Sequence, residues 1–269
     1  MIRVITWNVA RRASRLPDQA TAVAGREPDV VALQEVTLRT TALWCRAFEL
    51  MGLTHVRASA SRDDVSGGSS VPRTLVMVAS RFALEDVEEP LAVPWPECAV
   101  SALAHTPVAP VEIHCLHVPN AANGWVKVET LQALRRGLGT AARAPRVLCG
   151  DLNTPRRELP DGGTISFACD SRGRVRPDRG PEWDAAELGV VPGLRDLGYR
   201  DAYRTVHGYD SRSPSWTWKT IAGHDGGWRL DHIFVSAELL PLACHYHHGW
   251  REEGLSDHSA LEADLEQRR

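Results

Sequence analysis

Short apolar runs rich in β-branched residues recur along the chain and are typical of buried β-strands. They cover Ile2–Ile5, Val30–Leu33, Thr74–Ala79, Val111–His117, Arg146–Cys149, Leu230–Val235 and Ala260–Leu265. Between them, apolar residues at helical spacing predict helices over Gln19–Arg26, Thr41–Met51 and Val126–Ala142. Helices alternate with strands in the first half, strands and loops dominate the second, and no repeat of fixed period is present. This order predicts an α/β fold of two packed sheets with outer helices.

Two segments between the predicted elements have the composition of loops. Ser61–Val71 is rich in Ser and Gly and is expected to be mobile. Pro155–Pro181 is long for a connection and carries six arginines against four acidic residues. Arg156 and Arg157 in this segment are candidates for contact with a phosphate backbone, and the alternative is a solvated surface loop.

Composition excludes some classes of protein. The 269 residues are 43% hydrophobic and 24% charged, with a formal net charge of −3. These values are typical of a soluble globular protein and exclude a surface that is basic throughout, although they allow a local basic patch. No apolar run approaches the ~18 residues of a membrane span, and the N-terminus lacks the apolar stretch of a signal peptide. We expect one catalytic domain over residues 1–269, a cytoplasmic monomer and no membrane contact.

The six cysteines form no CxxC pair and show no regular spacing. Cys115 and Cys149 lie inside predicted strands, where a thiol behaves as a small apolar group. We expect all six to be reduced, with disulfide pairing as the weaker alternative.

Five short polar islands each adjoin an apolar run. They are Thr6–Asn8, Leu33–Glu35, Gly150–Asn153, Arg229–His232 and Ser256–His258. Strand ends that converge on one rim of a sheet would gather these side chains in a single site. Their carboxylates, carboxamides and imidazoles supply hard oxygen ligands and titratable nitrogens, which is the chemistry of a Mg²⁺-assisted phosphoester hydrolase.

Asn8 and Glu35 each end a predicted strand. A carboxylate and a carboxamide side by side can hold one Mg²⁺ and leave its other positions to water and substrate oxygens. Taken alone, Asn8 is typical of a turn and Glu35 of a surface charge. Together with the other islands, they predict a metal site.

Asp151 and Asn153 follow the run Arg146–Cys149, and side chains two residues apart on a strand point the same way. Asp151 can orient or deprotonate an attacking water, and Asn153 can hold a phosphate oxygen. The preceding Gly150 permits close approach of the backbone to a ligand. The alternative is a β-turn in which the Asp and Asn side chains bind their own backbone.

Asp257 and His258 stand side by side just before the last apolar run. An imidazole needs a carboxylate to fix its tautomer and to stabilise its protonated form. Asp257 can do this only if the backbone turns sharply, so Asp231 is the better partner and Asp257 is expected on the metal side. His258 then either activates water or contacts the scissile phosphate as an imidazolium.

In this order the islands resemble the endonuclease/exonuclease/phosphatase superfamily of metal-dependent phosphoesterases, and within it the exonuclease III/AP endonuclease branch. The resemblance runs from Thr6–Asn8 to Ser256–His258 and includes Val118–Asn120 and Trp216–Trp218. It implies a four-layer α/β sandwich like that of deoxyribonuclease I, with the active site at one rim of two facing sheets. It also implies that Asn120 contacts the substrate.

The resemblance further implies residue roles. Mg²⁺, with Mn²⁺ as a substitute, is held by Glu35 with help from Asn8 and Asp257. Asp151 and Asn153 align water for in-line attack. These two roles agree with those argued from residue type and placement. The resemblance also pairs His258 with Asp231.

His117 departs from the AP endonuclease pattern, which usually has a tyrosine before Val118–Asn120. An imidazole donates a proton to a leaving alkoxide more readily than a phenol does. In members like deoxyribonuclease I and sphingomyelinase, a histidine at the corresponding strand end can serve as general acid. We expect His117 to be catalytic, the alternative being a histidine bound to a carbonyl group. The substitution weakens an assignment of abasic-site specificity.

Trp216 and Trp218 are expected to project to the same side of a strand and to form an aromatic wall for a sugar or base. The alternative is packing in the core. In the run His245–His248, neighbouring side chains point to opposite faces and no carboxylate stands at ligand spacing. We therefore interpret that run as structural and not as a metal site.

Three functions follow in order of preference. The first is a Mg²⁺-dependent phosphodiesterase acting on nucleic acid, above all DNA, as an endonuclease or 3′-exonuclease. The second is an enzyme of the same fold acting on a small phosphoester, such as a phospholipid headgroup, an inositol phosphate or a nucleotide. The third is a non-catalytic binding module that has kept the fold. Such a module would lack at least one metal ligand or catalytic base, and the polar islands of this chain lack none.

Overall fold

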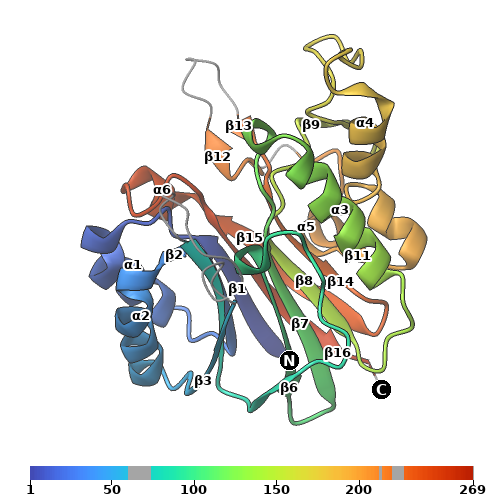
Figure 1. The fold of residues 1–269 in the computed structure, drawn as a ribbon. Coiled ribbons are helices and arrows are strands. Elements are labelled where there is room, and N and C mark those ends of the chain that lie inside the picture. Colours follow the sequence, from blue (N-terminus) through green and yellow to red (C-terminus); the bar gives the residue numbers. More distant parts are fainter. Residues whose placement is uncertain (60–73, 212–213, 220–226, 269) are drawn as a thin grey trace.

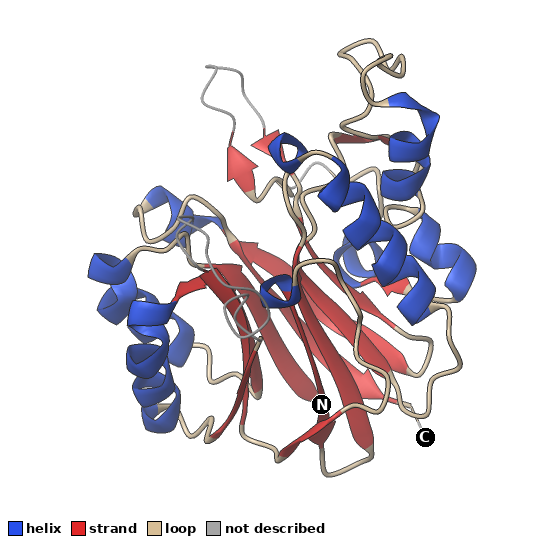
Figure 2. Ribbon diagram, in the orientation of Figure 1, coloured by secondary structure: helices blue, strands red, loops and turns tan. Residues whose placement is uncertain are grey.

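A computed structural model describes residues 1–59, 74–211, 214–219 and 227–268 of the chain. Two six-stranded mixed sheets pack face to face, and helices cover their outer faces (Figures 1 and 2). The prediction of an α/β sandwich with two mixed sheets flanked by helices is confirmed. The predicted loop Ser61–Val71 lies outside the described residues.

The first sheet has the strand order β15-β16-β1-β2-β4-β3. The bounds are β1 Ile2–Asn8, β2 Val30–Thr37, β3 His55–Ala58, β4 Thr74–Ser80, β15 Leu239–His247 and β16 Ala260–Gln267. Alternate side chains of β1 face opposite sides, so that Val4 joins the core between the sheets while Ile5 and Trp7 pack toward the outer helices. These helices are α1 Leu16–Ala24 and α2 Leu38–Leu50.

The second sheet has the order β11-β14-β8-β7-β6-β5. Its bounds are β5 Leu84–Asp86, β6 Ala99–His105, β7 Pro110–His117, β8 Arg146–Asp151, β11 Arg200–Asp201 and β14 Asp231–Val235. An apolar cluster joins its outer face to α3 Trp125–Leu138 and α4 Gly180–Leu188. The short helix α5 Ala202–His207 adds Ala202 and Tyr203 to the core between the sheets.

The remaining elements are short and lie mainly around one rim. They are the strand pairs β9 Arg157–Glu158 with β10 Thr164–Ile165 and β12 Trp218–Lys219 with β13 Gly227–Trp228, the helix α6 His248–Glu252, and 3₁₀ turns at Ala13–Arg15, Pro96–Cys98, Ala121–Asn123 and Gly193–Leu197. Among the described helices, none has both the length and the apolar character that crossing a bilayer requires. All six cysteines are free thiols.

The segment predicted as one long loop, Pro155–Pro181, is held to the body of the protein by buried charges. Its Glu158 accepts hydrogen bonds from Arg229 and Arg204, and Arg229 also contacts Asp201. Burial alone would raise the pKa of Glu158, but the guanidinium of Arg229 outweighs burial and lowers that pKa from 4.5 to about 2. The segment is therefore ordered by tertiary contacts that its loop-like composition does not indicate.

A second buried pair holds Phe167, in the middle of the same segment, and the two residues that precede the segment. Glu187 of α4 accepts hydrogen bonds from Lys127 of α3 at 2.7 Å, and from Thr154 and the backbone N–H of Phe167, both at 2.8 Å. Lys127 in turn donates to the carbonyl oxygen of Asn153 at 2.8 Å. These bonds connect the helical layer to the rim where β8 ends.

Candidate active site

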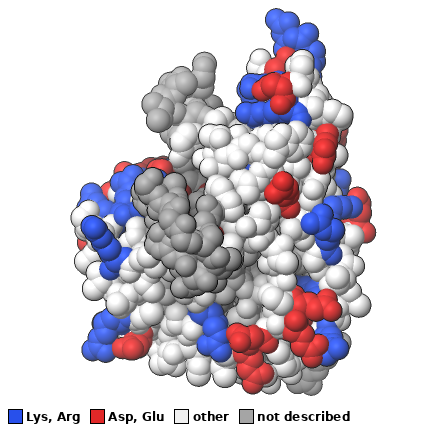
Figure 3. Space-filling model, viewed as in Figure 1, with Lys and Arg blue, Asp and Glu red and all other residues white. Residues whose placement is uncertain are grey.

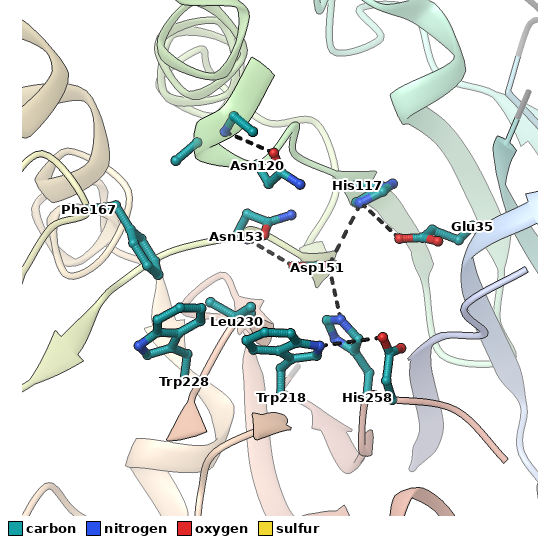
Figure 4. Close-up of a pocket in the computed structure, with 13 residues that line it drawn as sticks. Glu35, His117, Asn120, Asp151, Asn153, Phe167, Trp218, Trp228, Leu230 and His258 are labelled. Carbon is teal, nitrogen blue, oxygen red and sulfur yellow. Dashed lines mark hydrogen bonds and ion pairs between the residues drawn. The ribbon is translucent and has the colours of Figure 1, made fainter. Parts of the chain in front are cut away.

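The ends of the central strands surround a cavity of about 390 Å³ (Figure 4). Glu35 reaches it from β2 in the first sheet, and His117 and Asp151 reach it from β7 and β8 in the second. His258, just before β16, completes this part of the lining. Both sheets therefore contribute titratable side chains to one cavity.

Gly150 is required by the packing of β8 against β7. Its φ is +133°, and a Cβ added there would lie 2.0 Å from the carbonyl oxygen of Leu116. The prediction that this glycine admits a ligand is therefore wrong, because the group that approaches it is the neighbouring strand. Asp151, the next residue, stands opposite Asp231 of β14 in the antiparallel register.

His258 lies between two buried carboxylates. Its Nδ1 is 2.8 Å from Oδ2 of Asp231, and its Nε2 is 3.8 Å from Oδ2 of Asp151. Burial disfavours the charged imidazole, but the two carboxylates outweigh it and raise the pKa of His258 to about 10. His258 is thus an imidazolium at neutral pH, and Asp231 is the carboxylate paired with it.

Asp151 is also affected by this arrangement. Burial, and then the negative charge of Asp231, raise its pKa above the usual value, while the imidazoles of His258 and His117 act in the opposite direction. A carboxylate with a raised pKa is a better proton acceptor than an ordinary one.

Asn8 joins the two sheets at the base of the site. Its Nδ2 lies 3.2 Å from Oε1 of Glu35 and 3.1 Å from Oδ2 of Asp151, while its Oδ1 accepts a hydrogen bond from the backbone of Ala10. The amide N–H groups of Asn8, and not its oxygen, therefore face the carboxylates. Asn8 thus holds the two acidic side chains at a fixed separation.

Glu35 is placed by an irregularity in β2. The pairing of β2 with β4 shifts register between Leu33 and Val36, and Glu35 adopts a φ of +56°, which is rare for a residue with a side chain. Its Oε2 lies 2.9 Å from Nε of Arg11. The bulge thus turns Glu35 toward the rim and the cavity.

The donor set suits a hard divalent cation. The carboxylates of Glu35, Asp151 and Asp257 line the same cavity, and oxygen atoms are the ligands that such ions prefer. A second set, Asp151, Asp231 and His258, has ligand atoms within 4.8 Å of one another, but the two carboxylates raise the pKa of His258 to about 10, so a metal there would have to displace a firmly held proton. The side of the cavity that carries Glu35 is therefore the better place for an ion.

His117 stands between the acidic groups at the cavity wall. Its Nε2 lies 3.7 Å from Oε1 of Glu35 and 3.8 Å from Oδ2 of Asp151, and its side chain is 21% exposed. No hydrogen bond to a carbonyl group fixes this imidazole in the described part of the chain. It remains available to a bound substrate.

The two predicted asparagines also line the cavity. Asn153 has a φ of +50° and donates from Nδ2 to the carbonyl of Val118 at 2.8 Å, which leaves its other amide N–H for a ligand. Asn120 caps the 3₁₀ turn that follows it by accepting from the backbone N–H of Ala122 at 3.0 Å.

Aromatic rings form the wall opposite His117. Trp218 and Trp228 stack with their centroids 5.2 Å apart, and Phe167 meets Trp228 edge-on at 5.0 Å (Figure 4). Trp218 was predicted here, but Trp216 lines a neighbouring cavity instead. Sequence reasoning did not predict Trp228 or Phe167 in the cavity. Trp228 could have been found from its position beside the Arg229–His232 island, but nothing in the sequence around Phe167 indicated a site.

Comparison with known proteins agrees with this geometry. The sequence profile described as "Endonuclease/Exonuclease/phosphatase family" matches residues 5–258. The chain belongs to this family. The family predicted from the polar islands is therefore confirmed, and so is the fold.

Individual family members differ widely from this chain in sequence. The DNA repair nuclease APEX1 of Danio rerio is 31% identical over 48% of this chain, and that match spans only 40% of its own length. An AP endonuclease from Archaeoglobus fulgidus superposes with a TM-score of 0.71 at 23% identity, covering 99% of this chain and all of the other. A 3′ phosphatase from Neisseria, NExo, bound to a product DNA hairpin, gives 0.68 at 23% identity with the same coverage. At these identities the two structures show the shared fold.

Arg156 and Arg157 do not line the cavity of this family member. Arg156 donates to the carbonyl of Cys169 at 3.0 Å, and Arg157 is exposed on β9. Their contact with substrate stays a prediction.

The histidines of β15 have a carboxylate partner that sequence spacing did not reveal. His245 and His247 lie 3.6 Å and 2.9 Å from Glu262 of β16, because strand pairing brings that residue beside them. Arg26 also binds both oxygens of Glu262, at 2.7 Å and 2.9 Å. Sequence spacing did not indicate this carboxylate. The interpretation of the run as structural stays a prediction, and the guanidinium of Arg26 opposes a metal there.

Proposed function

We propose that this protein is a divalent-metal-dependent phosphodiesterase that hydrolyses nucleic acid, with DNA as the first choice of substrate and endonuclease or 3′-exonuclease as the activity. One observation carries the proposal: acidic groups from both sheets, two histidines and an aromatic wall all line a single cavity. The carboxylates and histidines suit phosphoryl chemistry, and the wall suits a sugar or base.

Glu35 and Asp257 are the residues that we expect to hold the cation, with Mg²⁺ preferred and Mn²⁺ as a substitute because every donor is oxygen. When bound, such an ion neutralises charge on the phosphate and lowers the pKa of water. Asn8 supports the metal side by fixing Glu35 relative to Asp151.

Asp151 is the proposed base for the attacking water. Its raised pKa suits proton acceptance, and its position beside Asn8 and Asn153 fixes the direction from which water approaches. The free amide N–H of Asn153 then binds a phosphate oxygen. Asp151 and Asn153 thereby align water and phosphorus for in-line attack.

His258 is the proposed hydrogen-bond donor, in contrast to Asp151, the proposed proton acceptor. As an imidazolium paired with Asp231, it donates a hydrogen bond to the phosphate and stabilises the charge that develops there. His117, on the other side of Asp151, is the proposed general acid for the leaving oxygen. The site therefore places its base between the two imidazole groups, 3.8 Å from each.

Nucleic acid is favoured over a small phosphoester by what surrounds the cavity. Stacking on indole rings contributes about 1–3 kcal/mol per base, and Trp218 and Trp228 offer two such rings. Exposed arginines at positions 157, 172 and 174 lie on the segment before α4, and Figure 3 shows basic side chains at the outer end of the molecule above that helix. The partially matching relative is named as a DNA repair nuclease.

A panel of substrates tests the proposal. Labelled oligonucleotides that are abasic, nicked, blunt, single-stranded or RNA are compared with an inositol phosphate and a phospholipid, each with Mg²⁺ and with EDTA. We expect Mg²⁺-dependent cleavage of a DNA member of the panel. Turnover confined to the small phosphoesters would instead select the second candidate function, and EDTA-resistant cleavage would contradict the metal assignment.

A further inference from the structure

A second cavity, of about 450 Å³, adjoins the catalytic one. The two cavities share Trp218 and Asp257, whose side chains approach each other with 3.4 Å between Nε1 and Oδ2. Trp218 therefore forms a partition, with Trp228 stacked on it in the catalytic cavity (Figure 4). A ligand longer than one nucleotide can pass over this partition from one cavity to the next.

Two arginines line the second cavity without a carboxylate partner. Arg12 donates to the carbonyl of Gly254 at 3.1 Å, and Arg251 donates to the carbonyls of Trp216 and Thr217 at 3.2 Å and 3.3 Å. Within the described part of the chain, neither guanidinium lies within 4.0 Å of a carboxylate oxygen. Both keep their charge and several N–H groups available to an anion.

Arg11, the residue before Arg12, does have a carboxylate partner. Arg11 forms an ion pair with Glu35 at the catalytic cavity, whereas Arg12 lines the second cavity. Arg11 and Arg12, which are consecutive in the chain, thus lie at adjacent cavities. A phosphate that lies beyond the partition would therefore meet an arginine that no carboxylate within 4.0 Å neutralises among the described residues.

Aromatic surface accompanies these charges. Trp216 is half-buried in the wall of the second cavity, and its ring lies 6.3 Å from that of His248 of α6. Guanidinium groups beside indole rings are the combination that holds a phosphate together with its base in single strands. Two carboxylates, of Glu252 and Asp257, share the lining.

We propose that this second cavity binds the nucleotide next to the one whose phosphodiester is cleaved, with its phosphate on Arg12 and Arg251 and its base against Trp216. The inference rests on the proposed nuclease function and makes it more specific. The substrate is then a strand that occupies two cavities and not an isolated phosphoester.

Oligonucleotide binding tests this subsite. The double variant Arg12→Ala/Arg251→Ala is compared with Arg46→Ala/Arg143→Ala, which removes the same charge at two exposed arginines that line neither cavity. Fluorescence anisotropy, in an Asp151→Asn background that prevents turnover, gives Kd for single strands of 2 to 12 nucleotides between 50 and 200 mM salt. Circular dichroism and melting confirm that each variant is folded.

We expect Kd of the longer strands to rise at least 10-fold in Arg12→Ala/Arg251→Ala. The slope of log K against log salt should fall by about 1.4, because two phosphate contacts on a single strand are lost. Arg12→Lys/Arg251→Lys should keep most of the slope, since it keeps the charge. The control pair should match the parent protein.

Two outcomes overturn the inference, and they differ. If the parent cleaves oligonucleotides but the Arg12/Arg251 variant binds them with the slope of the control, the subsite does not exist. If the parent neither binds nor cleaves any oligonucleotide, the proposed function fails and the subsite fails with it.

Discussion

Nδ1 of His258 lies 2.8 Å from Oδ2 of Asp231, while Nε2 of the same ring faces Asp151 at 3.8 Å. One imidazole is therefore shared by two buried carboxylates, which favours its charged form. This relationship favours one of the two roles that sequence left open for His258. A ring that is already protonated cannot accept a proton from water, so we expect His258 to act on the phosphate.

The first prediction concerns the pH dependence of turnover. The pKa of His258 is raised from 6.5 to about 10, so its active, charged form persists through neutral pH and is lost as pH rises through about 10. The raised pKa of Asp151 sets the acid limb, because its basic form appears only as pH rises through that pKa. A kcat profile from pH 4 to 11 should fall above about pH 10. A rate that increases through that pH would assign His258 the role of base.

Replacing Asp231, the partner of His258, should remove the raised pKa of that imidazole. Asp231→Asn keeps the shape of the side chain but removes the charge, so the pKa of His258 should fall and kcat should drop by about 10²- to 10⁴-fold, as for comparable catalytic pairs. NMR titration of the imidazole measures the first effect and steady-state kinetics the second. The exposed Asp178→Asn serves as the control and should leave both unchanged. Equal kcat in Asp231→Asn and the parent would contradict the assignment.

The metal assignment makes a separate prediction. Glu35→Gln removes a charged oxygen ligand while keeping its size, so about 10-fold or more additional Mg²⁺ should be needed for half-maximal activity. Titration with Mn²⁺, followed by electron paramagnetic resonance, measures affinity without relying on turnover. Glu49→Gln, an exposed change on α2, is the matched control. Normal activity of Glu35→Gln at low Mg²⁺ would show that the ion binds elsewhere.

The buried pair Glu158–Arg229 predicts sensitivity to acid. The pKa of Glu158 is lowered from 4.5 to about 2, so its contribution is complete above about pH 4.5 and is lost as pH falls toward 2. That shift corresponds to about 3 kcal/mol of unfolding free energy as an upper limit. Urea unfolding at pH 7, 4.5 and 3 should show a shallower loss for Glu158→Gln than for the parent. Glu49→Gln should behave like the parent, and a parallel loss in all three proteins would contradict the role of Glu158.

The central strands and the polar residues at their ends were predictable from sequence, because apolar runs and strand-end islands are local patterns. The strand β15 was not, since Pro241 and two histidines interrupt its apolar alternation. This strand forms by pairing with β16, and the residues of β15 themselves do not show that pairing.

The same limit applies within the site. Sequence placed Asp151 and His258 correctly in one cavity, yet it could not show that the amide N–H groups of Asn8 face the carboxylates. Nor could it show that Trp216 lines only the second cavity while Trp218 lines both, although residues two apart on a strand were expected to share a face. Strand β12 begins only at Trp218, so that expectation does not extend to Trp216.

Glu35 and Asp151 come from different sheets, and Asn8 of the first sheet donates hydrogen bonds to both. A refolding intermediate in which only one sheet has formed therefore lacks part of the catalytic apparatus, because the second sheet carries His117, Asp151 and Asp231 but not Glu35. During refolding, far-ultraviolet circular dichroism can recover before the sheets have docked, whereas hydrolysis cannot. Recovery of turnover thus reports the docking of the two sheets in this chain.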